Sequence, residues 1–175
     1  MNDMINSIII RIATPTDAPA MAEVYMRSWE AAYKGFIPAD YISEKRGKSV
    51  PDMKRLLADE SLSPYQYVII LDKSIVGILT VAYARDEDAG ENCYELWGVY
   101  LHPEYFRRGI GSLAMEFAYE KARCLGKTEI ILWVFEKNED SIKFYEKCGF
   151  SADGCRKTII CGKPLAAIRM RKKLA

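Results

Sequence analysis

A short glycine turn between a predicted strand and a predicted helix constrains the fold of this chain more than any other feature. Residues 95–101 form a β-rich run, and apolar residues recur at helical spacing from Ile110 to Leu125. Gly109 and Gly111 lie between them, directly after two arginines. Glycines let the backbone approach a ligand closely, and the first amides of a helix have no intrahelical acceptor. The sequence therefore predicts a turn that binds a phosphate or a pyrophosphate.

Two alternative interpretations of this turn stay open on the motif alone. In the first, the glycines open an ordinary helix, and Arg107 and Arg108 are solvated surface residues. In the second, residues 109–114 are the G-x-G-x-x-G/A fingerprint of a dinucleotide-binding fold. That fold places its glycines at the end of the first strand and needs a second half after them. Here residues 102–108 intervene and too little chain follows Gly111, which disfavours a dinucleotide site.

Length, composition and charge narrow the class of protein. The 175 residues suit a single domain (1–175) with a real core, and the net charge of +1 argues against a nucleic-acid surface. No apolar run approaches the roughly 18 residues of a membrane span, and residues 1–4 do not resemble a signal peptide. Five cysteines without CxxC spacing are expected to be reduced thiols of a cytoplasmic protein. The single histidine, His102, has no partners at ligand spacing, so we expect no metal site.

The other predicted elements indicate a mixed sheet. Strands are expected at residues 7–12, 65–71, 74–84, 129–135, 151–160 and 165–173. Long helices are expected at 18–32 and 138–148, and two short ones at 39–47 and 50–59, the last with Ser49 as its cap and Pro51 in its first turn. Counting the two short helices together, we expect about seven strands and about four helices, with antiparallel hairpins at both ends and parallel crossovers in the middle. This pattern predicts an α/β (α+β) fold with a mixed sheet covered by helices.

Two motifs together resemble the signatures of the GNAT superfamily of N-acetyltransferases. Residues 106–111, Phe-Arg-Arg-Gly-Ile-Gly, resemble its acetyl-CoA pyrophosphate loop, and residues 138–150 resemble its second signature. They occur in the right order on successive elements, and residues 10–17 resemble the family's opening strand and cap. One position departs from the family pattern, which begins with Gln or Arg where this chain has Phe106. The resemblance implies a GNAT-like fold over nearly the whole chain and acetyl-CoA as cosubstrate.

The resemblance also implies which residues hold acetyl-CoA. The pantetheine arm would lie along the central strand at Val99, Tyr100 and Leu101, where Gly98 suits a bulge that splays this strand from the next. The pyrophosphate would be held by amides that match Arg107, Arg108, Gly109, Ile110, Gly111 and Ser112. Asn138 and Ser141 match positions that often touch the cofactor, with capping of the helix as the alternative role of Asn138.

Amine acetylation requires two proton movements, and the resemblance suggests a residue for each. An alkylammonium of pKa about 10.4 needs roughly 4–5 kcal/mol to lose its proton at pH 7, whereas a thiol leaving group of pKa about 8.5 needs about 2 kcal/mol. Glu95 matches the glutamate base of the histone-acetylating branch, and its apolar neighbours are expected to raise its pKa. The alternative is that Glu95 is exposed or pairs with a lysine. Tyr145 matches the general acid, with a packed tyrosine as the alternative. Because an amine can attack the thioester directly, no covalent enzyme intermediate is required, and we expect none of the five cysteines to act as nucleophile.

The acceptor is the least determined part of the prediction. Glu95 and the acidic loop at residues 85–92 favour a primary amine that is a small cation or a peptide amine. Aromatic residues crowd the segment after the first helix, and the resemblance makes Trp29, Tyr33 and Phe36 one wall of the acceptor site, with helix packing as the alternative. A non-catalytic acyl-CoA-binding module and a longer-chain acyltransferase stay open as other functions. An exposed edge strand near residues 165–173 would permit a homodimer.

Overall fold

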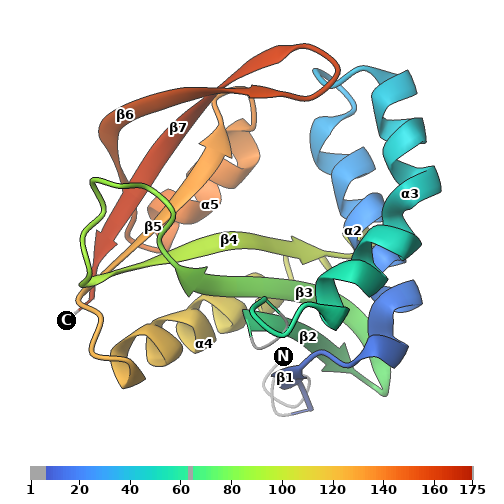
Figure 1. Ribbon diagram of the computed structural model, residues 1–175, viewed down its shortest axis with the longest axis horizontal. Coiled ribbons are helices and arrows are strands. Elements are labelled where there is room, and N and C mark those ends of the chain that lie inside the picture. The colour runs from blue at the N-terminus through green and yellow to red at the C-terminus, as the bar shows by residue number, and fades with distance from the viewer. Residues whose placement is uncertain (1–6, 63–64, 175) are drawn as a thin grey trace. The chain divides into compact units, whose positions relative to one another are not determined.

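The structure, a computed structural model, describes residues 7–62 and 65–174, so the expectation about residues 1–4 lies outside it. A seven-stranded sheet has the order β1-β2-β3-β4-β5-β7-β6 (Figure 1). Its strands are β1 (Ile9–Ile12), β2 (Gln66–Leu71), β3 (Ser74–Tyr83), β4 (Cys93–Leu101), β5 (Glu129–Phe135), β6 (Ser151–Ile160) and β7 (Pro164–Lys173). The α-helices are α2 (Ala18–Tyr33), α3 (Ala39–Ala58), α4 (Ile110–Cys124) and α5 (Glu139–Lys147). Since β4 pairs with β5 in parallel and the other recorded pairs are antiparallel, the predicted mixed sheet is confirmed.

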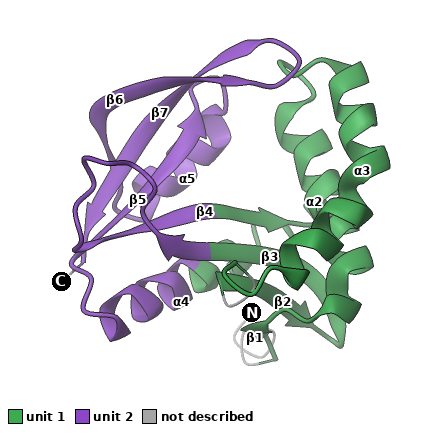
Figure 2. Ribbon diagram, viewed as in Figure 1, with its two compact units in different colours: residues 1–80, 98–114 green, residues 81–97, 115–175 purple. Residues whose placement is uncertain are grey.

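The chain divides into two compact units, which Figure 2 colours separately. Unit 1 comprises Met1–Thr80 and Gly98–Ala114, and unit 2 comprises Val81–Trp97 and Met115–Ala175. Strands β3 and β4 and helix α4 contribute residues to both units. The expectation of a single domain over residues 1–175 therefore stays a prediction. Every helix within residues 7–62 and 65–174 is too short or too polar to cross a lipid bilayer.

Unit 1 is built around two antiparallel helices that share a core with the first strands. Side chains from α2, α3, β2 and β3 are buried together, among them Met21, Val24, Met53, Leu57, Val68 and Ile78. Arg46 of α3 also reaches Glu30 and Glu23 of α2, at 2.7 and 3.2 Å. These exposed ion pairs add little free energy, so the apolar contacts hold the helix pair together.

Helix α3 is continuous, whereas the sequence predicted two short helices at 39–47 and 50–59. Ser49 does not cap a new helix, because its hydroxyl donates to the carbonyl of Arg46 at 2.8 Å inside the helix. Pro51 removes one helical amide, yet Met53 and Leu57 are buried on the following turns. The predicted break was wrong because tertiary packing outweighs the local proline and serine signals.

In unit 2 the closing hairpin of β6 and β7 is confirmed, but its predicted edge strand is wrong. Strand β7 lies between β5 and β6, and its Arg171 is paired with Ile131 on one side and with Ser151 on the other. Buried residues alternate along β7, whereas nearly every residue of β6 is exposed. A polar strand tolerates an edge better than a half-buried one does. A homodimer through this edge stays a prediction, and it would have to use β6 rather than residues 165–173.

Candidate active site

The turn before α4, in unit 1, has the conformation that an anion-binding loop needs. Arg107 and Gly109 both have positive φ, 60° and 82°, and the helix begins at Ile110. The amide of Leu113 donates to the carbonyl of Gly109 at 3.1 Å, so the preceding amides lie in the first turn, which lacks intrahelical acceptors. Ile110 is 1% exposed and anchors the turn in the core, whereas residues 106–109 are exposed. The predicted donors are therefore grouped at the surface, at the positive end of a 15-residue helix.

The charges of this turn come from its two arginines. The guanidinium of Arg108 lies over the ring of Tyr105, 5.2 Å from its centroid, and Arg107 is exposed. Phe106, which replaces the polar residue of the family pattern, is 41% exposed. The turn therefore keeps its amides and both positive charges and lacks one polar side chain.

In unit 1 the last three residues of β4 are approached closely by strand β3. Val99 and Leu101 pack into the apolar cluster that includes Ile110, and the ring of Tyr100 lies near that of Tyr25, with centroids 4.8 Å apart. A Cβ at Gly77 of β3 would lie 2.5 Å from Cδ2 of Leu101 and 3.2 Å from the carbonyl oxygen of Tyr100. Glycine is therefore required for β3 to approach the predicted cofactor strand.

In unit 2 the first residues of β4 form a parallel ladder with β5. Residues 93–96 of β4 pair with residues 129–132 of β5, so the recorded pairing stops two residues before Gly98. Strand β5 continues to Phe135 and pairs there with β7. The bulge expected at Gly98 stays a prediction.

The predicted acceptor wall, in unit 1, is a chain of aromatic rings. Trp29 and Tyr33 form an edge-on pair with centroids 4.8 Å apart, and Tyr33 and Phe36 are 5.5 Å apart. Lys45 of α3 places its ammonium 4.8 Å from the Trp29 ring. Trp29 is 7% exposed, and its indole nitrogen has no hydrogen-bond partner among the described residues. Trp29 thus belongs to the packing of α2 onto α3, while Tyr33 and Phe36 are half-buried; their role toward an acceptor stays a prediction.

Glu95, in unit 2, is neither exposed nor paired with a lysine. Its side chain is 1% exposed, and both of its oxygens accept hydrogen bonds from Arg85. The backbone amide and Nε of Arg85 donate to Oε2 at 3.0 and 3.1 Å, and Nη2 donates to Oε1 at 2.5 Å. The guanidinium also lies over the ring of Trp97, 4.2 Å from its centroid. The structure therefore gives the predicted base a half-exposed arginine as its partner.

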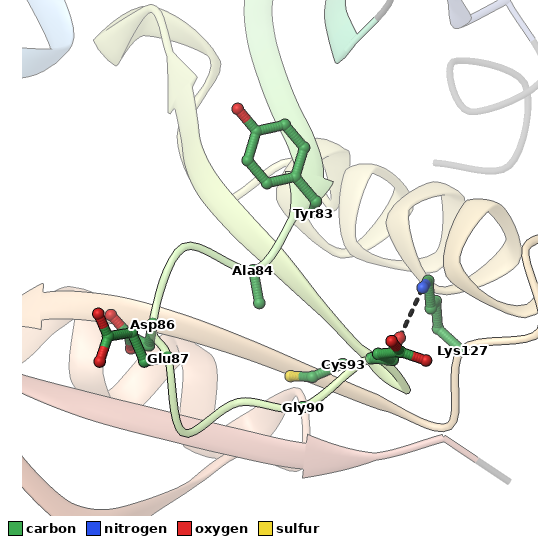
Figure 3. A pocket seen from close by; sticks show the side chains of 8 residues that line it. Tyr83, Ala84, Asp86, Glu87, Gly90, Cys93 and Lys127 are labelled. Carbon is green, nitrogen blue, oxygen red and sulfur yellow. Dashed lines mark hydrogen bonds between the residues drawn. The ribbon is translucent and has the colours of Figure 1, made fainter.

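The acidic loop after β3 borders an open cavity of about 490 Å³ (Figure 3). Lys127 lies on one side of it and donates to the carbonyl of Glu91 at 2.6 Å, and Asp86 and Glu87 lie together on the other side. Cys93 also lines the cavity, and burial raises the pKa of its thiol to about 11. The cavity is lined by Tyr83, Ala84, Asp86, Glu87, Gly90, Glu91, Cys93 and Lys127. All five cysteines are free thiols, as predicted.

Much of the negative charge of this loop is neutralised by one buried arginine, Arg169 of β7. Its side chain is 4% exposed. Nη1 donates to Asp86 at 3.0 Å and to Asp88 at 2.6 Å, and Nε donates to Asp153 at 2.7 Å. Hydrogen bonding to Arg169 lowers the pKa of Asp88. Asp86 also accepts from the indole of Trp133 at 2.8 Å, so the loop is tied to the sheet.

Helix α5 and its N-cap carry the remaining predicted residues, Asn138, Ser141 and Tyr145. The carboxamide oxygen of Asn138 accepts from the amide of Ser141 at 3.3 Å, so Asn138 is the N-cap, as the alternative interpretation held. Tyr145 is 9% exposed, and its ring lies 5.3 Å from that of Phe144 and 6.0 Å from that of Phe150. Tyr145 is thus a packed tyrosine, and its catalytic role stays a prediction.

Sequence reasoning missed two arginines, Arg85 and Arg169. Arg85 begins the acidic loop at residues 85–92, and nothing in the local sequence links it to Glu95. The sequence did contain a signal for Arg169. It lies two and four residues after Ala167 and Leu165, so all three side chains share the buried face of β7. A cation at a buried strand position requires acidic partners, and the loop supplies two of its three aspartates.

Comparisons with known proteins agree with this geometry. The profile described as "Acetyltransferase (GNAT) family" matches residues 20–150, well over half of the chain. The spermidine N(1)-acetyltransferase of Thermoplasma acidophilum is 26% identical over 84% of this chain and 90% of its own. The peptidyl-lysine N-acetyltransferase YiaC of Escherichia coli is 26% identical over 84% of this chain and 86% of its own. A crystal structure of the PaiA N-acetyltransferase of Thermoplasma acidophilum with coenzyme A has a TM-score of 0.75 and 26% identity, and the alignment covers 95% of this chain and 99% of that one. The chain therefore belongs to the GNAT family of acetyltransferases.

Proposed function

We propose that this protein transfers the acetyl group of acetyl-CoA to a primary amine on a cationic acceptor, either a polyamine or a peptide lysine. The turn before α4 carries the donor half of the proposal, because its exposed amides and arginines suit a pyrophosphate. Two relatives support the acceptor half, since their names record spermidine and peptidyl-lysine as substrates. Both acceptors present an alkylammonium, the group that a buried carboxylate such as Glu95 would receive.

The residues present fit acetyl-CoA at three places. Amides of Arg107, Arg108, Gly109, Ile110, Gly111 and Ser112 hold the pyrophosphate, with added charge from the two arginines. The backbone of Val99, Tyr100 and Leu101 holds the pantetheine arm, which the end of the β4–β5 ladder at Leu96 supports. Ser141 contributes its hydroxyl, and Asn138 its NH₂ group, because the oxygen of Asn138 caps α5.

Two side chains of unit 2 move the protons. Bound acetyl-CoA supplies a thioester whose carbonyl carbon accepts the nucleophile. Glu95 takes a proton from the acceptor's ammonium, and the neutral nitrogen then attacks that carbon directly. The C–S bond breaks as the C–N bond forms, and Tyr145 gives its proton to the departing sulfur. The acylated nitrogen then loses its second proton to the tyrosinate, which restores Tyr145, and Glu95 releases its proton to solvent. Tyr33 and Phe36, which are half-buried, contact the carbon chain of the acceptor, and the buried Trp29 packs edge-on against Tyr33.

A free-thiol release assay with acetyl-CoA tests this function. The panel comprises spermidine, a lysine peptide, an aminoglycoside and free amino acids, with butyryl-CoA as a second donor. We expect turnover with the cationic amines and with acetyl-CoA as the better donor. Melting temperatures with and without acetyl-CoA separate the outcomes. Stabilisation by acetyl-CoA without thiol release across the panel would instead identify a non-catalytic acyl-CoA-binding module.

The same assay tests Tyr145 as general acid. Because a thiol of pKa about 8.5 needs only about 2 kcal/mol of help, we expect Tyr145→Phe to lower kcat by about 30-fold without a large change in KM for acetyl-CoA. Tyr119→Phe is the matched control. Tyr119 is 2% exposed, lies near Phe150 with centroids 6.3 Å apart, and donates its hydroxyl to the carbonyl of Cys148. Equal losses in both variants would show that only packing is disturbed.

A glycine substitution tests the phosphate turn. Gly109→Ala places a Cβ on a residue with φ of 82°, which costs about 1 kcal/mol of strain and shifts the turn. We expect KM for acetyl-CoA to rise by about 5- to 10-fold. Gly126→Ala is the control, because Gly126 has φ of 69° at the other end of α4 with nothing within 4 Å of the added Cβ. It should lower stability to a similar extent and leave KM unchanged; a rise in both variants would refute the assignment.

A further inference from the structure

The geometry points to Arg85 as a determinant of acceptor specificity. We propose that its guanidinium occupies the place of the acceptor's cation, so that acceptor binding displaces it from Glu95. The inference rests on the proposed function, because it takes Glu95 as the residue that receives the acceptor amine. Arg85, Glu95, Trp97 and Tyr83 all belong to unit 2.

The hydrogen bonds of Glu95 show why displacement is needed. Oε2 accepts from both the amide and Nε of Arg85, and Oε1 accepts from Nη2. With a side chain 1% exposed, Glu95 has no solvent-facing surface through which a second cation could approach. The Arg85 side chain is 49% exposed, so it is the half of the pair that can move into solvent. Its backbone amide would stay in place and keep Oε2 oriented.

An aromatic surface completes the position that Arg85 occupies. Trp97 lies under the guanidinium at 4.2 Å, and its indole nitrogen donates to the carbonyl of Tyr83 at 3.1 Å. The Tyr83 ring meets that of Trp97 edge-on with centroids 5.4 Å apart, and Tyr83 is 50% exposed. The face of an indole attracts an alkylammonium as well as a guanidinium, so this position suits either cation.

The need to keep the charge of Glu95 paired then selects the acceptor. Removing the hydrogen-bonded arginine from a buried carboxylate is strongly unfavourable, whereas exchanging it for another cation keeps the charge paired. A cationic amine can therefore replace Arg85, and an uncharged acceptor cannot. Arg85 acts as an internal competitor for Glu95. It raises the concentration of amine that is needed to occupy the site, and it keeps neutral nucleophiles away from Glu95.

Isothermal titration calorimetry with spermidine and with a lysine peptide tests this role without requiring turnover. Arg85→Gln keeps a polar stem over Trp97 and removes the competing charge, so we expect its Kd for at least one of these cations to fall about tenfold. Arg85→Lys keeps one charge but lacks the planar fork that matches a carboxylate, so its Kd should lie between those of the Gln variant and the wild type. Arg55→Gln, at a residue 79% exposed on α3, should leave the Kd unchanged.

The outcomes separate this inference from the proposed function. The displacement of Arg85 is supported if, for either cation, Arg85→Gln binds most tightly, Arg85→Lys less tightly and the wild type least tightly. Affinities for both cations that are unchanged or weaker in both variants, with native-like circular dichroism spectra, would overturn it. Because the Lys variant keeps the charge pair, it remains informative if the Gln variant does not fold. Gain of affinity without thiol release would reject the acetyltransferase function alone, and thiol release without gain of affinity would reject the role of Arg85 alone.

Discussion

Arg169→Met is expected to lower the free energy of unfolding by about 3–5 kcal/mol, because it removes the shared partner of three carboxylates. Arg169 is 4% exposed, and Asp86 and Asp153 are 19% and 16% exposed. Methionine fills most of the volume, so the loss is electrostatic rather than a cavity effect. Urea unfolding at pH 7 measures the difference, with an unchanged m-value as the sign that the folded state is still compact.

A matched substitution in the same hairpin isolates the effect of burial. Arg156 of β6 pairs with Glu136 at 2.6 Å, but its side chain is 66% exposed. Arg156→Met should therefore change stability by less than about 1 kcal/mol. Similar losses in the two variants would mean that the Arg169 cluster is no more stabilising than a surface pair, which would contradict its role as an anchor.

The same cluster links stability to the candidate site. Asp86 and Asp88 lie in the loop that also contains Arg85, so anchoring this loop on β7 fixes the backbone amide that donates to Glu95. In Arg169→Met we expect faster hydrogen exchange in residues 84–92 than in the Arg156→Met control. The buried arginine thus acts on the site by ordering the loop rather than by touching a substrate.

Local chemistry explains which parts of the fold were predictable. The turn between β2 and β3 uses Asp72 and Lys73, both with positive φ, and a two-residue turn between β-rich runs is a strong hairpin signal. Gly149, with φ of 87°, ends α5 where the sequence placed the stop. In the turn before α4, the glycine spacing and the family resemblance agreed on the same residues. Such features depend on a few neighbouring residues, which a single sequence displays in full.

The features that were missed depend on residues far apart in the chain. The position of β7 between β5 and β6 follows from strand pairing, which the local pattern of residues 165–173 does not specify. The continuity of α3 across Pro51 depends on packing against α2. Arg169 lies more than 80 residues from Asp86 and Asp88, so only the folded register brings these charges together. Glu95 could be proposed as a base from its position, but its Arg85 partner required the structure.

Glu95→Gln is expected to lower kcat/KM for spermidine at pH 7 by about 10²- to 10⁴-fold, the range in which general base catalysis contributes. The substitution keeps the size of the side chain and removes its ability to take a proton. Without the base, the reaction must meet the full free-energy cost of removing the proton from the alkylammonium, roughly 4–5 kcal/mol at pH 7. This cost is the larger of the two proton transfers. The loss should therefore exceed that in Tyr145→Phe, measured in the same thiol-release assay.

The control is a second carboxylate that pairs with an arginine in the same unit. Glu129 of β5 accepts a hydrogen bond from Arg171, and its side chain is 27% exposed. Glu129→Gln breaks a similar ion pair outside the proposed chemistry, so we expect kcat/KM to stay within about threefold of wild type, as for substitutions outside the groups that act on substrate. A large loss in both variants would indicate that ion pairing across this sheet, and not proton transfer, sustains activity.

The pH dependence of the Glu95→Gln rate separates a base from a structural residue. Below the pKa of the acceptor, the neutral fraction of the amine rises about tenfold per pH unit. The variant depends on that neutral fraction, so its rate should climb with this slope up to about pH 9, and its deficit against the wild type should shrink. An acceptor amine of lower pKa should reduce the deficit at pH 7 for the same reason. A deficit that stays constant with both pH and amine basicity would mean that Glu95 only positions Arg85 and its loop, and that the proton leaves the acceptor by another route.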